Sequence, residues 1–156
     1  MRVLAIDPGY DRMGVAILET DKTNDVLIHS ECIETNKKDS PADRLLSIGL
    51  RLEELFHAHA PNVVAIETLF FNKNQKTAMQ VAEARGVVVY LAKKFNCDVK
   101  EFGPKMVKLA VTGYGASDKK SVTTMLSHLV KNLPKKALDD EYDAIAIGIT
   151  ALHTRL

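Results

Sequence analysis

Short apolar runs separated by polar turns dominate the start of the chain. Val3–Ile6 is a continuous apolar run, which is typical of a strand buried on both faces of a sheet. It ends at Asp7-Pro8-Gly9, and two further runs, Gly14–Thr20 and Val26–Glu34, flank a polar turn. Three strands in such quick succession predict an antiparallel meander.

Helical periodicity begins after this meander and then alternates with further strands. Ser40-Pro41 supplies a cap residue and a first-turn proline, and helical spacing continues to about Ala60. Val63–Ile66 is a second continuous apolar run and ends at Glu67. The remaining predicted elements are helices over Gln75–Phe95, Pro104–Thr112, Ser117–Val130 and Leu138–Leu152 and a short strand over Cys97–Phe102. This order predicts an α/β fold with helices on both faces of a mixed five-stranded sheet.

Length and composition are those of a water-soluble globular protein. The 156 residues fit one domain covering 1–156, and 46% of them are hydrophobic and 26% charged. The apolar runs are too short to cross a bilayer, and the N-terminus has no signal-peptide pattern, so we expect a cytoplasmic protein with no membrane contact. Cys32 and Cys97 form no paired motif and are predicted to be buried free thiols.

The net charge of +1 is uninformative, but its distribution is not. Residues 73–136 hold 13 basic against 4 acidic residues, whereas residues 1–72 hold 7 against 12 and residues 137–156 hold 1 against 4. A basic middle between acidic ends is typical of a protein that binds a polyanion and keeps carboxylates for a metal site. Solvated helix faces would give the same counts.

Four carboxylates are the candidate chemical groups. Asp7 and Glu67 each end a buried strand, where side chains of an α/β sheet point into the ligand-binding crevice. Asp140 and Asp143 are three residues apart, so they share one face of the last helix, and Ile147 continues that face toward the core. Converging carboxylates repel one another unless divalent cations lie among them, and all-oxygen ligation favours Mg²⁺ or Mn²⁺.

Each acid also has an ordinary structural interpretation. Asp7 before Pro-Gly could start a turn, and acids at a helix start complement its dipole. The combination of two strand-end acids with an i, i+3 pair favours a metal site instead, at which two ions could assist an in-line phosphoryl displacement. The sequence offers no nucleophile elbow, no cysteine–histidine motif and no phosphate loop ending in Gly-Lys-Ser/Thr.

Four motifs resemble the successive signatures of RuvC-type Holliday-junction resolvases. They are Ile6-Asp7-Pro8-Gly9, Ala65-Ile66-Glu67, Ala82-Glu83-Ala84-Arg85-Gly86 and Asp140–Ile147, in the family's order and roughly its spacing. The resemblance covers nearly the whole chain and implies a ribonuclease H-like fold. One departure is Met13-Gly14-Val15-Ala16, where many relatives carry Thr-Gly-aromatic-Gly; this segment is closer to the RNase H-fold proteins of the YqgF type.

The resemblance implies specific roles for residues of this chain. Asp7, Glu67, Asp140 and Asp143 correspond to the catalytic, metal-binding tetrad, while Asp139 occupies a non-catalytic position. The implied cofactor is Mg²⁺, for which Mn²⁺ would substitute, with two ions per subunit. The implied reaction is hydrolysis of four-way junction DNA by a homodimer, in recombination and repair, leaving 5′-phosphate ends. Whether a branch-migration helicase is also a partner stays open.

Aromatic and basic residues form the expected DNA contacts. Phe70 follows the Glu67 strand closely, and its ring could stack on an unpaired base at the junction centre, as the resemblance implies. Lys108 and Lys119 resemble family positions that contact phosphates near the cut. The remaining candidates for DNA binding are Lys73, Lys76, Lys105 and Lys120.

The small residues Ala78, Ala82 and Gly86 repeat every four positions along one predicted helix. They form a flat stripe that either lies on the sheet or, as the resemblance implies, belongs to a dimer interface.

Two alternative functions stay open: an RNA nuclease of the YqgF type and a non-catalytic junction-binding protein. An actin-like ATPase is disfavoured because the chain is too short for a second domain.

Overall fold

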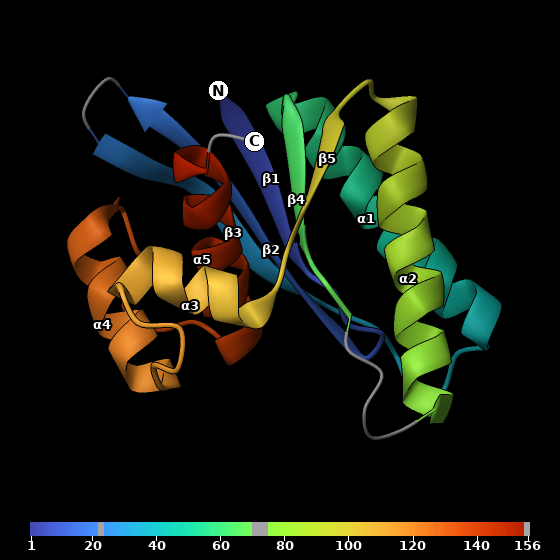
Figure 1. Cartoon of the computed structure of the whole chain (residues 1–156). Helices are drawn as coiled ribbons and strands as arrows, with labels where there is room; N and C mark the ends of the chain where they lie inside the picture. Colours follow the sequence, from blue (N-terminus) through green and yellow to red (C-terminus); the bar gives the residue numbers. More distant parts are fainter. Residues whose placement is uncertain (22–23, 70–74, 155–156) are drawn as a thin grey trace.

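A computed structural model describes residues 1–21, 24–69 and 75–154, and Figure 1 shows how its strands and helices are arranged. The strands are β1 (Arg2–Asp7), β2 (Arg12–Asp21), β3 (Asn24–Glu34), β4 (Val63–Glu67), β5 (Asp98–Phe102) and β6 (Val130–Lys131). The helices are α1 (Pro41–His59), α2 (Gln75–Lys94), α3 (Pro104–Thr112), α4 (Lys119–Leu129) and α5 (Asp139–His153). The predicted elements occur in the predicted order, with ends that differ by one or two residues, and the short strand β6 is an addition.

The strands form one mixed sheet in the order β5-β4-β1-β2-β3-β6. β1, β2 and β3 are the predicted antiparallel meander, and β4 and β5 add to it in parallel. The sheet has six strands rather than the five predicted, because Val130 and Lys131 leave the end of α4 and pair in parallel with β3 at Asp25 and Val26. Two residues of strand at the end of a helix carry no periodicity of their own, so the sequence pattern could not separate them from the helix.

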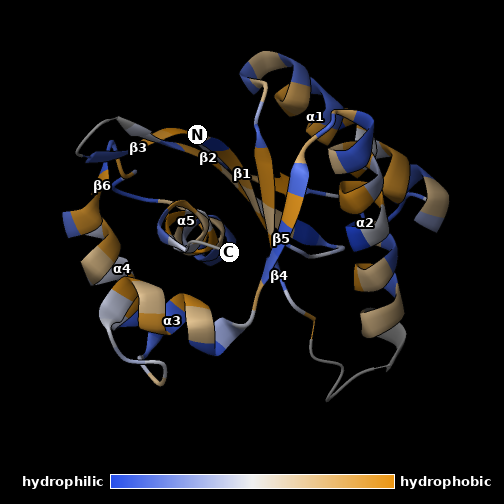
Figure 2. Ribbon diagram, turned by 45° about the horizontal axis from the view of Figure 1, so that its top comes forward, coloured by the Kyte–Doolittle hydropathy of each residue, from blue (hydrophilic) through white to orange (hydrophobic). Residues whose placement is uncertain are grey.

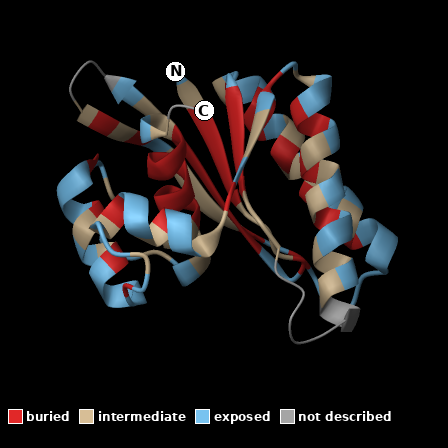
Figure 3. Ribbon diagram, viewed as in Figure 1, coloured by how far each residue is buried: buried red, intermediate tan, exposed pale blue. Residues whose placement is uncertain are grey.

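Alternate residues of the central strands pack on opposite faces of the sheet. Val3 and Ala5 belong to the core under α3, α4 and α5, whereas Leu4 and Ile6 belong to the core under α1 and α2. Both faces are therefore apolar, which explains the uninterrupted apolar runs in β1 and β4. Figure 3 shows the buried strands between the partly exposed helical layers.

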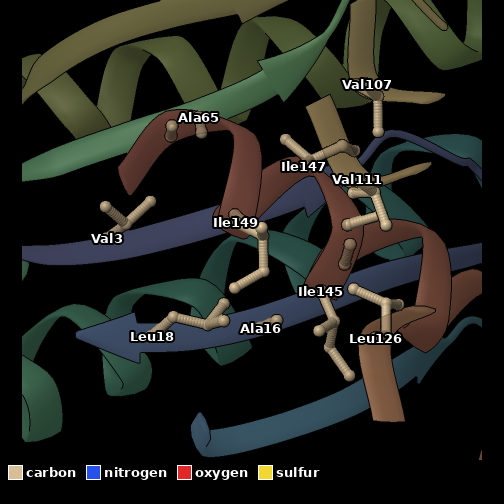
Figure 4. Close-up of a cluster of buried hydrophobic side chains, with 14 of the residues drawn as sticks. Val3, Ala16, Leu18, Ala65, Val107, Val111, Leu126, Ile145, Ile147 and Ile149 are labelled. Atoms are coloured by element: carbon tan, nitrogen blue, oxygen red, sulfur yellow. The ribbon is translucent and has the colours of Figure 1, made fainter. Parts of the chain in front are cut away.

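Helix α5 is the most deeply buried helix of the described chain. Every residue from Ala144 to Ala151 is buried. Figure 2 looks nearly along this helix and shows it enclosed between the sheet and helices α3 and α4. In the close-up, Ile145, Ile147 and Ile149 lie among side chains of the sheet and of α3 and α4 (Figure 4). A helix that is apolar on all sides needs such enclosure.

The two thiols differ in burial. Cys97 is buried as predicted, but Cys32 is only half-buried, and both are free. Across the described ranges, no helix combines the length and the apolarity that a membrane crossing requires.

Candidate active site

The sheet register brings the two strand-end acids together. β1 and β4 are parallel neighbours in which Ile6 is paired with Ile66, so Asp7 and Glu67 end adjacent strands at the same edge. Asp7 follows Val3 and Ala5 at intervals of two, and Glu67 follows Val63 and Ala65 in the same way, so both acids continue the face that α5 covers. The strand alternation alone thus aims both carboxylates at α5.

The other two acids approach from the start of α5. Asp140 and Asp143 lie in its first turns, with side chains 21% and 38% exposed. Gly14, opposite Asp7 on β2, lets the helix come this close, because a Cβ atom there would lie 1.9 Å from the backbone oxygen of Asp140. Gly14, the residue of this segment that agrees with the common family pattern, is therefore a close-packing position.

Glu141 holds the start of α5 against the sheet. Its carboxylate accepts a hydrogen bond from the Ser30 hydroxyl on β3 at 3.1 Å and another from the Leu138 backbone N–H at 3.4 Å. Leu138 is the N-cap residue, and its side chain has no oxygen with which to cap the helix. Glu141 thus supplies the polar contact that the cap lacks, between the two acids that face the sheet. Sequence reasoning named it only as part of a motif.

Burial and mutual repulsion perturb the acids on the strands. The pKa of Asp7 is raised from 3.8 to about 8, first by burial and then by the negative charges of Glu67, Asp143 and Asp140. The pKa of Glu67 is also raised, mainly by burial and by the charge of Asp143. These shared causes show that the four acids lie in one electrostatic environment. Such a group is stabilised by added positive charge.

Lysines supply part of that charge. The Lys119 ammonium lies 3.1 Å from Asp143 and 3.6 Å from Asp139. Lys119 and Lys108 line a hollow beside the acids, together with Glu67 and Asp143. Asp139 is 78% exposed and contacts this lysine. The two lysines for which phosphate contacts were expected therefore border the predicted carboxylates.

Arg12, which sequence reasoning did not single out, lies on another side of the cluster. Its guanidinium Nη2 is 3.2 Å from Asp140 Oδ2. The approach is close enough for an ion pair but lacks hydrogen-bond geometry, since among the described residues the buried Oδ2 atom receives no hydrogen bond. The contact is therefore an ion pair without a hydrogen bond. A basic residue at the start of a strand carries no sequence signal for such a role.

The loop that precedes Arg12 is held in place by a residue of α1. The buried Arg44 of α1 donates hydrogen bonds to the Asp11 carboxylate and, at 2.7 Å, to the Thr35 hydroxyl. Its guanidinium also lies 4.0 Å from the centre of the Tyr10 ring. These contacts hold the backbone between Asp7 and β2, so they position the acid and the arginine together.

The donor set fits a divalent cation. Four carboxylates provide only oxygen ligands, as Mg²⁺ and Mn²⁺ prefer, and Asp140 Oδ2 is a buried acceptor without a donor. Within the described chain, however, no three metal-ligating side chains already lie close enough to form a ready-made site. The fit therefore rests on the chemistry of the oxygens and their shared electrostatics.

The other predicted DNA contacts are less well placed or fall outside the described residues. Phe70 and Lys73 lie outside them, and Lys76 lies in α2 with its side chain undescribed. Lys105 on α3 and Lys120 on α4 are exposed, but neither lines the hollow that Lys108 and Lys119 border.

The small-residue stripe of α2 faces away from the sheet. Ala82 and Gly86 are exposed, and a Cβ atom added at Gly86 would meet no other atom within 4 Å. Among the residues of this helix whose burial the structure describes, Ala84, Val88, Leu91 and Ala92 are buried and belong to the core on this side of the sheet instead. Of the two interpretations of the stripe, packing on the sheet is thus wrong.

Comparisons with known proteins agree over nearly the whole chain. Residues 3–151 match the family described as crossover junction endodeoxyribonuclease RuvC. The enzyme of that name from Rickettsia prowazekii is 36% identical over 152 residues, covering 97% of each chain. The one from Petrotoga mobilis is 40% identical, covering 94% of this chain and 90% of its own. The structure of T. thermophilus RuvC in complex with a Holliday junction substrate superposes with a TM-score of 0.90 at 29% identity, covering 96% of this chain and 92% of that one.

Proposed function

The chain belongs to the RuvC family of crossover junction endodeoxyribonucleases, and on that premise we propose that it resolves Holliday junctions by cutting four-way junction DNA in recombination and repair. The observation that carries the proposal is that acids from β1, β4 and α5 come together at one end of the sheet, where β1 and β4 are parallel neighbours and α5 begins against Gly14 of β2. The fold is the ribonuclease H-like fold of this family. Residues 1–156 would act as one nuclease domain.

Membership of this nuclease family implies dependence on a divalent metal ion. We propose Mg²⁺, with Mn²⁺ able to substitute, and two ions per subunit. Asp7, Glu67, Asp140 and Asp143 would hold them. Bound there, the ions would supply an activated water and stabilise the leaving oxygen. The chain's own contribution is to hold the four carboxylates in place, through the β1–β4 register and the Glu141 contacts of α5.

Basic residues would bind the DNA backbone around this centre. Lys108 and Lys119 border the carboxylates and would contact the phosphates beside the cut. Lys73, Lys76, Lys105 and Lys120 would extend the positive surface that the basic middle of the sequence predicts. Phe70, close after Glu67 in the sequence, would stack on a base at the junction centre.

We propose a homodimer, because a four-way junction must be cut in two strands and a two-fold dimer presents two identical sites. The exposed stripe of α2 would form part of the interface. An apolar groove between α1 and α2 supports this role. It is bordered by Leu46, Leu50 and Tyr90, each more than half exposed. Action in the cytoplasm and cooperation with a branch-migration helicase complete the proposal.

Cleavage and binding of a synthetic four-way junction test this function together. With Mg²⁺, the wild-type chain should make paired nicks, and the Asp7→Asn variant should make none, because the amide lacks the charge that holds a cation. Junction binding should survive in Asp7→Asn, since lysines provide most of the affinity. Magnesium-dependent cleavage by pure Asp7→Asn protein would remove Asp7 from the mechanism.

A panel of junction DNA, duplex DNA and structured RNA distinguishes the alternatives. Preferential cutting of RNA would favour the YqgF-type nuclease over the resolvase. Junction binding without cleavage in either Mg²⁺ or Mn²⁺ would instead indicate a non-catalytic junction-binding protein.

A further inference from the structure

The carboxylate cluster is bordered by two separate hollows. One contains Lys108 and Lys119 and reaches Glu67 and Asp143. The other shares no residue with it and reaches Asp140; it is lined by Gly9, Tyr10, Asp11, Arg12, Gln80, Val81 and Asp140. Arg12 is the basic side chain among the residues of this second hollow. A DNA strand that crosses the cluster has phosphates on both sides of the cut, and the lysines border only one hollow.

The backbone of Arg12 is held in place, whereas its side chain is half exposed. Its backbone begins β2, where it pairs with Glu34, and Arg44 anchors the preceding loop through Asp11. The side chain is 50% exposed and touches Asp140 by an ion pair without a hydrogen bond. The buried Asp140 Oδ2 atom favours a positive charge beside it, so Arg12 stays on Asp140 in the absence of metal. Because no hydrogen bond fixes the guanidinium there, Arg12 can leave once another cation takes its place.

A bound metal ion would change which positive charge neutralises Asp140. Without metal, Arg12 partly neutralises an acid that lies beside three others. A divalent cation held by the same carboxylate carries twice the charge and repels a guanidinium next to it. The cation would thus both replace Arg12 as the counter-charge of Asp140 and push it toward the second hollow.

We propose that Arg12 is a metal-released phosphate ligand: it is held on Asp140 in the metal-free protein and, when metal binds, turns into the second hollow to bind a backbone phosphate of the cut strand. The inference rests on the proposed function and adds a DNA contact opposite to those of Lys108 and Lys119. It also couples DNA binding to metal, because the phosphate contact becomes available only when the carboxylates are occupied. Guanidinium suits this ligand, since it binds phosphate oxygens in pairs.

The salt dependence of junction binding tests the release directly. Each phosphate contact adds about one to the slope of log affinity against log salt concentration. Binding of a four-way junction is measured by fluorescence anisotropy over a range of KCl concentrations, once with EDTA and once with Ca²⁺. The measurement uses only samples in which the junction remains uncut. With Ca²⁺, the slope of Arg12→Gln should be smaller than that of wild type by about one. With EDTA, the two slopes should agree.

Two controls make the result specific to Arg12. Arg12→Lys keeps the charge and should keep the wild-type slope. Arg2→Gln removes another arginine that is ion-paired with an acid, Glu19 at 2.8 Å, at the opposite end of β1, and should match wild type in both media. Equal slopes for wild type and Arg12→Gln with Ca²⁺ would overturn the proposal. So would an equal loss in Ca²⁺ and EDTA, or the same loss in Arg2→Gln.

Metal binding without DNA gives an independent readout. Because Arg12 competes with the cation for Asp140, Arg12→Gln should bind Mn²⁺ several-fold more tightly than wild type in a calorimetric titration, and Arg2→Gln should not. Weaker or unchanged Mn²⁺ binding by Arg12→Gln would mean that Arg12 does not compete, and would overturn the release.

A wild-type chain that binds duplex as tightly as junction in Ca²⁺ contradicts the proposed function itself. A wild-type chain that prefers the junction, combined with an unchanged Arg12→Gln slope, contradicts only the assignment of Arg12.

Discussion

At the scale of single residues, Asp7 lies where burial and three other acids all oppose its ionisation. In the unfolded chain this carboxyl titrates near 3.8, and in the folded, metal-free protein near 8. Between these values the folded state holds a proton that the unfolded state has lost, so protonation favours folding. That contribution is complete below pH 4 and disappears as the pH rises through about 8.

Asp7→Asn should therefore become increasingly more stable than wild type as the pH rises from about 4 to about 8 in EDTA. The asparagine imitates the protonated acid and does not titrate. Thermal unfolding at a series of pH values measures the Tm difference, which should reach several degrees near pH 8. Asp118→Asn is the control: the pKa of this exposed helix cap is lowered, so its contribution changes only below pH 4. A pH-independent difference for Asp7→Asn would show that Asp7 ionises normally.

Gly14 is a second residue on which the geometry of the site depends, because it has no Cβ atom. Gly14→Ala would place a methyl group 1.9 Å from the backbone oxygen of Asp140, and neither backbone can move aside without displacing α5 or β2. We expect a loss of about 1–3 kcal/mol in unfolding free energy, measured by urea denaturation, and loss of cleavage. Gly86→Ala is the matched control, because its methyl group meets only open space and alanine favours a helix by about 1 kcal/mol. A fully active, stable Gly14→Ala protein would contradict the close approach of α5.

At the scale of elements, α5 combines a buried apolar body with an acidic start. Its enclosure by the sheet, α3 and α4 fixes the direction of the helix, as Figure 2 shows. The rotation and depth of its first turn depend on fewer contacts, chiefly Gly14 and the Glu141 hydrogen bonds to Ser30 and Leu138. The body therefore provides stability, and the first turn provides the position of the acids.

Glu141→Ala should lower the unfolding free energy by about 1 kcal/mol, the usual cost of losing a helix cap. For a chain of this size that corresponds to a Tm decrease of about 2–4 °C. Cleavage should fall by more than stability explains, because Asp140 and Asp143 flank the lost contact. Glu141→Gln keeps one oxygen that can accept from the Leu138 backbone N–H, and its amide N–H can donate to the Ser30 hydroxyl instead of accepting from it. This variant should therefore retain most of the stability and activity. Equal losses in the two variants would assign the effect to charge rather than to positioning.

At the scale of the whole molecule, the two faces of the sheet serve different purposes. The α3–α4–α5 layer holds Asp140, Asp143 and the lysines around them, and Asp7 and Glu67 face this layer from the sheet. The α1–α2 layer presents the small-residue stripe and an apolar groove to solvent. Catalysis and the proposed assembly are thus assigned to opposite layers. A change on the exposed stripe of α2 should leave the four acids in place.

Ala82→Trp should therefore weaken the proposed dimer while the monomer stays folded. The exposed site accepts the larger side chain in the monomer but not against a second copy. Sedimentation measures the association, and the ratio of paired to single nicks in junction DNA measures its consequence, which should fall. Ser127→Trp, at an exposed position on α4 in the opposite layer, is the control. A wild-type chain that stays monomeric at micromolar concentration, also on junction DNA, would remove the dimer and weaken the resolvase assignment.

The sequence by itself determined the order of the elements and the convergence of acids at strand ends. Apolar runs, turn residues and helical spacing act between near neighbours in the chain, so they can be interpreted without the fold. Val3–Ile6 and Val63–Ile66 predicted buried strands, and strand alternation then required Asp7 and Glu67 to face one layer.

Tertiary structure alone decided the contacts between residues far apart in the chain. It paired Arg12 with Asp140, brought Gly14 against α5, connected Glu141 to Ser30, and added the short β6 to the edge of the sheet. Each depends on the register of strands and on the depth at which one helix lies against the sheet. No local pattern encodes these quantities, because they result from packing the whole core at once.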